Sequence, residues 1–512
     1  MGRAFLADKA SGKVREAGTP LEERDAFERA YMSVREDLRS LAEENEIFAA
    51  HLEMLEDPML SDSVTEAIDE GADASHAVEA TCAQICMMFA GVEDEYLRSR
   101  MDDVRDVCSR LEDAISGRTD SPWKDMPEGS IVVSEELLPS DIAGMDLSRV
   151  EGFVAATGSR TSHVCIMAGS SGIPAIVSVD ISGIRSGDLI LMDAGSGKVI
   201  TDPSEAEAES FRRRIDALED EKRLAQALAH SPAVTRGGTT VPVLANAGSI
   251  EDVGAAIAAG ADGIGLLRTE FVFMHAQDLP SEEEQYGIYR AAAEVCGDRP
   301  LTIRTLDIGG DKPLPYLQMP REANPFLGVR GIRFSLRHME VFATQMRAIL
   351  RASVHGNVRV MFPMIAAASE LAKARECLRQ CMDGLRNEGI AFDEGMEVGM
   401  MVETPAAVLD AETLAAECDF FSIGTNDLTQ YLMAADRGDD AVAYADSDTD
   451  GPVSRAVEMV VSAAHKAGIK VGMCGEMASD PARTGKLVAT GLDEFSVAAP
   501  AVAAVKEMIR RI

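Results

Sequence analysis

The chain has 512 residues, about three times the usual size of one domain, so we expect several domains. Hydrophobic residues make up 46% of it and charged residues 26%, which excludes a disordered chain and indicates sizeable buried cores. Lysine and arginine number 49 against 86 aspartate and glutamate, a net charge of −37. This balance argues against a broad surface for nucleic acid or an anionic membrane, because both need a basic face.

The N-terminal segment has no apolar signal core, and no apolar run approaches the roughly 18 residues of a membrane span. We therefore expect a cytoplasmic protein without direct membrane insertion. The nine cysteines are scattered along the chain, which argues against a secreted disulfide framework. Two pairs, Cys82/Cys86 and Cys377/Cys381, are predicted to be core thiols, since no histidine or second cysteine pair completes a zinc set.

Residues 21–116 form an acidic block with almost no glycine, and we predict that the block is helical. Apolar residues recur every three or four positions from Phe27 to Leu41 and again from Leu97 to Ile115, the pattern of two long amphipathic helices. With shorter helices between them, these would form helical hairpins. Two interpretations stay open for the block, a plain bundle and a protein-docking surface.

Composition changes at Pro122. From there to about residue 202, short β-branched runs alternate with glycine and aspartate turns, which predicts a compact mixed α/β module. We assign residues 1–20 and 117–202 to this module and the charged stretch 203–234 to a linker helix.

From Thr239 onward, strand-like and helix-like segments alternate, with eight short apolar strand candidates. These begin near Val241, Gly263, Leu301, Val358, Val398, Phe420, Lys470 and Glu494. Eight β/α units in about 270 residues predict a (β/α)8 barrel, which we assign to residues 235–512. An open doubly wound sheet is the structural alternative.

Polar side chains follow six of the strand candidates, at the ends where barrel enzymes carry their chemistry. They are Asn246, Arg268, Arg304, Arg330, Glu403, Asn426, Asp427, Arg437 and Cys474. Four arginines in an acidic chain predict a local anion site, because guanidinium groups bind phosphate and carboxylate bidentately. Glu403 and Asp427 are hard oxygen ligands suited to Mg²⁺, and Cys474 could supply a proton or a nucleophile. The rim therefore predicts a site for a small phosphorylated carboxylate.

His163 lies between a glycine-containing loop and an apolar helical run that Gly172 closes. Thr161 and Ser162 are good N-cap residues, which puts the histidine near a helix N-terminus, where an anion is favoured. A neutral imidazole there can attack phosphorus, with Arg160 holding the phosphoryl oxygens. We interpret His163 as a phosphoryl acceptor rather than a structural histidine.

Seven segments carry a family resemblance. They are the stretch around His163, Gly265-Leu-Leu-Arg-Thr-Glu-Phe, Arg304-Thr-Leu-Asp-Ile-Gly-Gly-Asp-Lys, Asn324-Pro-Phe-Leu-Gly-Val-Arg, Glu403-Thr-Pro-Ala-Ala, Gly424-Thr-Asn-Asp-Leu-Thr-Gln-Tyr and Gly472-Met-Cys-Gly-Glu. In this order they resemble enzyme I of the bacterial phosphoenolpyruvate–sugar phosphotransferase system, as does His51-Leu-Glu-Met-Leu-Glu-Asp-Pro. Pyruvate phosphate dikinase and phosphoenolpyruvate synthase share the histidine and barrel motifs.

The resemblance implies an enzyme that passes the phosphoryl group of phosphoenolpyruvate to His163 and then to a histidine of a small phosphocarrier protein, releasing pyruvate. It assigns phosphoenolpyruvate binding to Arg268, Arg304, Asn426 and Arg437, with Arg330 and Asp427 in the same pocket. It also implies that Glu403 and Asp427 hold Mg²⁺ and that Cys474 protonates the pyruvate enolate. By the same resemblance, the helical block docks the phosphocarrier, residues 1–20 and 117–202 form the phosphohistidine domain, and the barrel forms a homodimer.

The chain departs from the family pattern at several points. The family has a further short segment before the point that matches Gly2, and it continues past Ile512 through helices that help dimerisation. Ser159 replaces a usual glycine, Gly169 replaces a usual arginine, and residues 439–451 are more acidic than in the family.

Two alternatives to the phosphotransferase predict other features of the sequence. A dikinase or synthase would need a nucleotide-binding domain, for which the segment before Pro122 is too short and too helical. A non-catalytic regulatory homologue predicts erosion of the rim or of His163, whereas these residues are all present.

Overall fold

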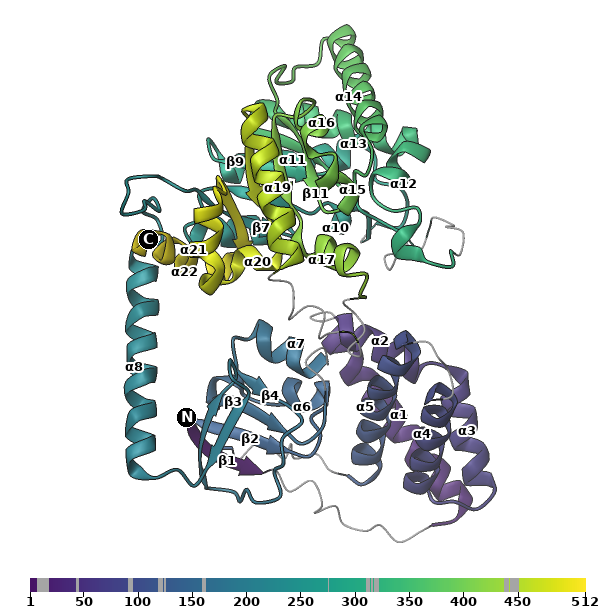
Figure 1. Cartoon of the computed structure of the whole chain (residues 1–512). Coiled ribbons are helices and arrows are strands. Elements are labelled where there is room, and N and C mark those ends of the chain that lie inside the picture. The colour runs from purple at the N-terminus through teal and green to yellow at the C-terminus, as the bar shows by residue number, and fades with distance from the viewer. Residues whose placement is uncertain are drawn as a thin grey trace. The chain divides into compact units, whose positions relative to one another are not determined.

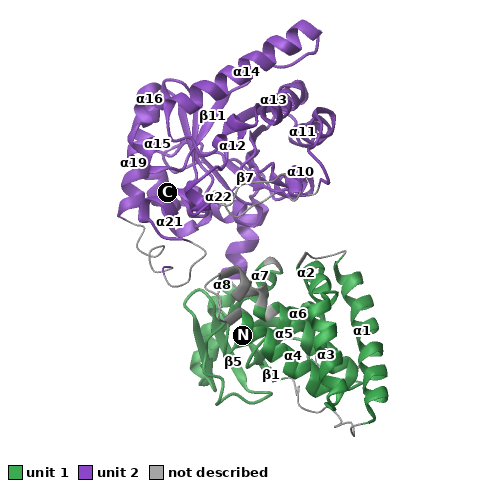
Figure 2. Ribbon diagram, turned by 90° about the vertical axis from the view of Figure 1, so that its right-hand side faces the viewer, with its two compact units in different colours: residues 1–217 green, residues 218–512 purple. Residues whose placement is uncertain are grey.

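The computed structural model describes residues 1–6, 18–42, 46–90, 95–117, 123, 126–158, 163–274, 276–309, 314, 316, 322–436, 442 and 451–512. It divides into two compact units, residues 1–217 and 218–512, which Figure 2 shows in different colours. Over the described part of the chain, no helix is at once long enough and apolar enough for a membrane crossing.

A helical bundle occupies the beginning of the first unit, drawn in purple and blue in Figure 1. Its helices are α1 (Pro20–Ala42), α2 (Glu46–Leu55), α3 (Pro58–Asp69), α4 (Ala74–Ala90) and α5 (Glu95–Ile115). The predicted apolar stripe of α1 is buried, with Phe27, Val34 and Leu38 in the bundle core. From α5, Cys108 and Leu111 join this core, whereas the side chain of Leu97 lies outside the described part. Two long helices with shorter ones between them are therefore confirmed.

A six-stranded sheet forms the rest of the first unit, in the order β4-β3-β2-β1-β5-β6. The strands are β1 (Gly2–Leu6), β2 (Ser130–Ser134), β3 (Val150–Ala155), β4 (Ala175–Ile176), β5 (Leu189–Asp193) and β6 (Lys198–Thr201). The strand β1 pairs in parallel with β2 and antiparallel with β5, so the first residues of the chain lie inside the sheet.

The two faces of this sheet have separate cores, because successive side chains of a strand point to opposite sides. Val132 packs on one face with α6 (Pro139–Ala143) and α7 (His163–Ser170), which contribute Ile142 and Val164. Its neighbours Ile131 and Val133 pack on the other face. The sheet thereby holds α7, and with it the backbone of His163, against its first face.

Eight parallel strands close into a barrel in the second unit. They are β7 (Val243–Ala247), β8 (Ile264–Leu267), β9 (Pro300–Arg304), β10 (Asn357–Phe362), β11 (Val398–Val402), β12 (Phe420–Ile423), β13 (Lys470–Met473) and β14 (Glu494–Ala498). Each begins within two residues of its predicted start, and β14 pairs with β7 to complete the closure. The predicted (β/α)8 barrel is confirmed, and the open doubly wound sheet is excluded.

Helices surround the barrel and connect its strands (Figure 1). They are α9 (Ile250–Ala258), α10 (Glu270–Met274), α11 (Glu282–Cys296), α12 (Ile332–Arg337), α13 (Met339–Ala352), α14 (Ala368–Glu388), α15 (Pro405–Leu409), α16 (Ala411–Ala415), α17 (Thr425–Met433), α19 (Pro452–Ala467), α20 (Glu476–Ser479), α21 (Pro481–Thr490) and α22 (Val502–Arg511). A further helix, α8 (Glu205–Ala227), precedes the barrel, and the boundary between the two units falls within it.

The barrel interior has a small core of its own, formed by Leu266, Met361, Met401, Phe420 and Cys474. The ring of Phe420 fits there because position 399 is glycine. A Cβ atom at Gly399 would come within 2.5 Å of that ring. The interior is therefore filled by side chains, and space for a ligand remains only towards an end of the barrel.

Candidate active site

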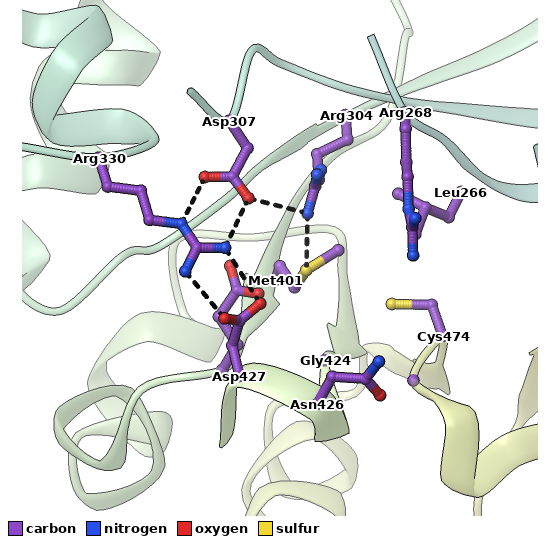
Figure 3. Close-up of a pocket in the computed structure, with 12 residues that line it drawn as sticks. Leu266, Arg268, Arg304, Asp307, Arg330, Met401, Gly424, Asn426, Asp427 and Cys474 are labelled. Carbon is purple, nitrogen blue, oxygen red and sulfur yellow. Dashed lines mark hydrogen bonds and ion pairs between the residues drawn. The ribbon is translucent and has the colours of Figure 1, made fainter. Parts of the chain in front are cut away.

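A polar pocket of about 70 Å³ lies at the carboxyl ends of the barrel strands (Figure 3). The rim residues predicted from the sequence that line it are Arg268, Arg304, Arg330, Glu403, Asn426, Asp427 and Cys474. Arg304 is the last residue of β9, and Glu403 follows β11 directly. Because parallel strands end at the same rim of a barrel, side chains far apart in the sequence meet in one pocket. Arg437 lies outside the described residues.

Arg330 lies between two carboxylates and is almost fully buried. Its Nε and Nη2 donate to the two oxygens of Asp307 at 3.1 and 3.2 Å. Its Nη1 and Nη2 donate to the two oxygens of Asp427 at 2.9 and 3.2 Å. Figure 3 shows the guanidinium group held between the two acids. The charge of Arg330 is thus already neutralised, and this residue fixes the positions of Asp307 and Asp427.

Arg304 is also held by acids. Its Nη2 donates to Glu270 Oε1 at 2.5 Å, and its Nη1 lies 3.2 Å from Asp307 Oδ2. Its buried Nε and the second oxygen of Glu270 have no hydrogen-bond partner among the residues that the structure describes. A buried donor without a partner costs about 1–3 kcal/mol, a cost that an acceptor bound in the pocket would remove.

Arg268 differs from both. It is exposed, and its guanidinium group makes no hydrogen bond or ion pair with any residue in the described part of the chain. In Figure 3 it reaches into the pocket from the same side as Arg304, above Cys474. The described arginines of the predicted anion site are therefore not equivalent. Arg304 and Arg330 already pair with carboxylates, whereas Arg268 has no such partner among the described residues.

Glu270 and Asp307, the acids that pair with the buried arginines, were not predicted from the sequence. The signal that could have found them is spacing. Glu270 follows Arg268 by two residues, and Asp307 follows Arg304 by three. An acid this close to a strand-end arginine lies near the same rim as the arginine.

Glu403 is 1% exposed, and its Oε1 accepts a hydrogen bond from the backbone N–H of Met364 at 2.6 Å. Burial, together with the nearby charges of Asp427 and Asp307, raises the pKa of Glu403 to about 8. Burial and the neighbouring carboxylates disfavour the ionised form of Glu403, and a bound divalent cation would favour it.

The lining fits such a cation in its charge and its ligand type. Three of the ionisable side chains in the lining are acids, Asp307, Glu403 and Asp427, and a bound cation would favour their ionised form. No cluster of three or more Asp, Glu, His or Cys groups suited to a metal occurs among the described residues. Two carboxylates suffice for Mg²⁺ when substrate oxygens and water supply the other ligands.

Cys474 follows β13 and is 4% exposed. Its Sγ lies 3.7 Å from the carbonyl oxygen of Ile423, and its own carbonyl accepts from Asn246 Nδ2 at 3.0 Å. Ser496 Oγ in turn donates to Asn246 Oδ1 at 2.7 Å. Burial raises the pKa of the Cys474 thiol to about 11. At neutral pH the group is therefore a thiol that can give a proton, and not a thiolate nucleophile.

Asn426 is oriented by two hydrogen bonds to the first residue of α20. Its Nδ2 donates to Glu476 Oε1 at 3.1 Å, and its Oδ1 accepts from the backbone N–H of Glu476 at 2.8 Å. The two segments approach closely because Gly475 has no side chain. A Cβ atom there would come within 1.9 Å of Thr425 Oγ1.

His163 is the first residue of α7, as the capping pattern predicted, and Gly172 follows the helix with φ +71°. The side chain of His163 and residues 159–162, which include Arg160, Thr161 and Ser162, lie outside the described part. His163 belongs to the first unit, and the pocket belongs to the second.

Known proteins resemble the chain over nearly its whole length. Three family models of PEP-utilising enzymes match it, the N-terminal domain over residues 1–100, the mobile domain over 126–197 and the PEP-binding domain over 222–512. The chain is 41% identical over 498 residues to the phosphoenolpyruvate-protein phosphotransferase of Bacillus sp., covering 95% of this chain and 86% of that protein.

Relatives of the same name show similar figures. The protein of Geobacillus stearothermophilus is 43% identical over 91% of this chain and 81% of its own length. That of Haemophilus influenzae is 41% identical over 96% of this chain and 86% of its own length.

Proposed function

Because the chain belongs to the phosphoenolpyruvate-protein phosphotransferase family, we propose that it transfers the phosphoryl group of phosphoenolpyruvate to His163 and then to a histidine of a small phosphocarrier protein, releasing pyruvate. The observation that carries this proposal is the pocket at the barrel rim, where seven predicted residues converge. Curated relatives that bear the phosphotransferase name favour this function over a dikinase, a synthase or a non-catalytic homologue.

In this function, the phosphate and carboxylate of the substrate bind to the free guanidinium group of Arg268, to Arg304 and to the oriented amide of Asn426. Arg330 acts one step away, by holding Asp307 and Asp427 in place. Arg437, which the family resemblance adds to this set, is included in the proposal. Guanidinium groups fixed in a buried pocket bind a phosphoryl group strongly because little reorganisation is needed.

The phosphoryl transfer has a simple balance. A nitrogen of the His163 imidazole forms a bond to phosphorus as the bond from phosphorus to the enol oxygen breaks, and the electron pair stays on that oxygen. The product in the pocket is the enolate of pyruvate, which must still gain a proton at carbon. Cys474 is suited to donate this proton because its thiol stays protonated at neutral pH.

We assign Mg²⁺ to Glu403 and Asp427. When bound, it would supply positive charge that stabilises the phosphoryl oxygens and the oxygen of the enolate. The raised pKa of Glu403, near 8, supports this assignment, because burial and the nearby carboxylates of Asp427 and Asp307 disfavour its ionised form, which a bound cation would stabilise.

The helical bundle is assigned to phosphocarrier docking. Its α2 and α3 helices and the turn between them expose several acids: Glu53, Glu56, Asp57, Asp62 and Glu66. Met59, 43% exposed, lies among them and offers an apolar contact. A partner with a basic rim and an apolar centre fits this face. We also propose a cytoplasmic location, a role in sugar transport and a homodimer formed through the barrel.

The test is to incubate the protein with Mg²⁺ and phosphoenolpyruvate labelled in the phosphoryl group. The expected result is one acid-labile, base-stable label on His163, which passes to a phosphocarrier protein added afterwards. A His163→Ala variant is the control, and it should bind phosphoenolpyruvate but carry no label. Label on another residue, or no label on the wild-type protein, would contradict the proposal.

A further inference from the structure

One buried glutamine connects the ends of two barrel strands. Gln345 lies on α13 and is 1% exposed. Its Oε1 accepts from the backbone N–H of Leu306 at 2.9 Å. Its Nε2 donates to Thr269 Oγ1 at 3.2 Å and to Tyr289 Oη at 3.0 Å. The amide therefore uses its oxygen and both of its N–H groups inside the protein.

The partners of Gln345 adjoin the arginines of the pocket. Thr269 directly follows Arg268, and Leu306 lies two residues after Arg304 and one before Asp307. The hydroxyl of Thr269 also donates to the carbonyl oxygen of Arg304 at 2.9 Å. A continuous set of hydrogen bonds thus runs from the end of β8 through Gln345 to the end of β9.

The residues that form these hydrogen bonds are buried. Thr269 and Tyr289 are 0% exposed, and Leu306 is 1% exposed. Water is therefore not at hand to replace a lost partner, and removing the amide would leave buried polar groups unsatisfied. The strand ends would then adjust to find new partners. The ion pair of Arg304 with Glu270, which follows Thr269, would move with them.

We propose that Gln345 is a positioning residue, which sets the distance and relative orientation of Arg268 and Arg304 and thereby the affinity of the pocket for the phosphorylated substrate. This inference rests on the function proposed above. Gln345 does not line the pocket and acts only through Thr269 and the segment after Arg304. Displacements of about 1 Å in groups that hold a substrate are known to cost two orders of magnitude in rate.

The chain offers a matched control in Gln285 on α11. It is likewise a buried glutamine, 0% exposed. Its Nε2 donates to Pro280 O at 2.9 Å, and its Oε1 accepts from Tyr289 Oη at 3.3 Å. It shares Tyr289 with Gln345 but bonds to neither strand end. Replacing either glutamine by methionine removes a buried amide at similar volume, and only one replacement should disturb the arginines.

The experiment compares Gln345→Met and Gln285→Met in the full chain, by melting temperature and by the KM and kcat for phosphoenolpyruvate with a phosphocarrier protein present to accept the phosphoryl group from His163. We expect both variants to lose stability, but only Gln345→Met to raise KM, by about tenfold, with a smaller fall in kcat. Equal KM changes in the two variants, or none in Gln345→Met, would overturn the positioning role.

Threonine variants keep the test decisive if Gln345→Met does not fold. Thr269→Val removes the hydroxyl at nearly constant shape and should raise KM, whereas Thr269→Ser restores the hydroxyl and should recover most of the affinity. An unchanged KM in Thr269→Val would overturn the inference. Failure of the wild-type protein to accept label from phosphoenolpyruvate is a different result, which rejects the proposed function itself.

Discussion

The barrel rim and the helical bundle each contain a cluster of buried ionisable side chains, and they differ in that the rim cluster lines a pocket. In the bundle, His51 is completely enclosed, with its Nε2 3.1 Å from Asp103 and its Nδ1 3.6 Å from Asp106. Arg110 lies 3.7 Å from Asp106, which also accepts from the backbone N–H of Ser140 at 3.0 Å. These side chains face one another, and the hydrogen bond from Ser140 to Asp106 links the bundle to the α/β module.

At the rim, the same types of residue line a pocket. Arg304 and Arg330 are closed onto acids in the same way, but they line a cavity that Arg268 enters without a carboxylate partner among the described residues. Burial is the first cause of a raised pKa in both clusters, for Asp106 as for Glu403. Buried charge and a raised pKa therefore do not identify a site by themselves. The rim differs from the bundle in having a pocket lined by a guanidinium group with no carboxylate partner among the described residues.

The largest expected difference between the two clusters comes from Glu403→Gln. The amide can still accept from the Met364 N–H, but it cannot ionise and so cannot act as a carboxylate ligand of Mg²⁺. We expect labelling of His163 to slow by about 10³-fold or more, because the variant lacks a buried carboxylate to which we assign Mg²⁺. Rapid-quench labelling with Mg²⁺ measures this, with the melting temperature as a check on folding. Labelling within tenfold of wild type would show that Glu403 belongs with the merely structural charges.

Arg304→Lys should have the next largest effect. Lysine keeps the positive charge but loses the fork that holds Glu270 and Asp307 together. One charge-assisted contact in such a site is worth about 2–4 kcal/mol, a rate factor of about 10² to 10³. Steady-state kcat/KM for phosphoenolpyruvate measures the loss. A change below about threefold would place Arg304 outside substrate binding.

Cys474→Ser tests the second chemical step. Serine is far less acidic than cysteine, so we expect labelled His163 to form in a single turnover while pyruvate protonation slows by about tenfold or more. Substituted phosphoenolpyruvate in deuterated water, followed by chiral analysis of the product, should show a loss of facial preference. Full turnover with full stereoselectivity would make Cys474 a packing residue.

The same variant has a pH signature. The thiol has a pKa of about 11 in the fold against an ordinary value of 9.0, so the folded protein keeps a proton that the unfolded chain loses between these values. The free energy of unfolding should therefore fall as pH rises from 9 to 11, and Cys474→Ser should remove this component. Denaturant unfolding at several pH values measures it, and identical slopes in both proteins would contradict the assignment.

Asp106→Asn should have the smallest effect on activity. We expect labelling of His163 to stay within about twofold, because this acid closes onto its neighbours and faces no substrate. The raised pKa of Asp106 means that the folded protein holds a proton which the unfolded chain releases above the ordinary pKa of 3.8. Wild-type stability should thus fall with rising pH above that value, relative to the variant. A large loss of labelling without a loss of stability would place the bundle cluster in the reaction.

The sequence alone determined the barrel and the membership of its rim. Strand positions follow from short apolar runs between glycine, proline and polar turns, which are local properties, and every strand begins within two residues of its predicted start. Residues directly after parallel strands share one rim whatever the packing around them. Seven residues of the pocket lining, from Arg268 to Cys474, could therefore be predicted from the sequence, whereas Asp307 was not, and Arg437 lies outside the described residues.

Only the tertiary structure decided which of these residues pair with an opposite charge and which of them have shifted pKa values. Arg330 meets Asp427 across 97 positions of the chain, and Arg304 meets Glu270 across 34. The pKa of Glu403 near 8 and that of Cys474 near 11 depend on burial and on neighbours from other strands. Gln345 reaches Thr269 from a helix 76 positions away. Coulomb energy, desolvation and hydrogen bonding depend on distances through space, which no local pattern of residues contains.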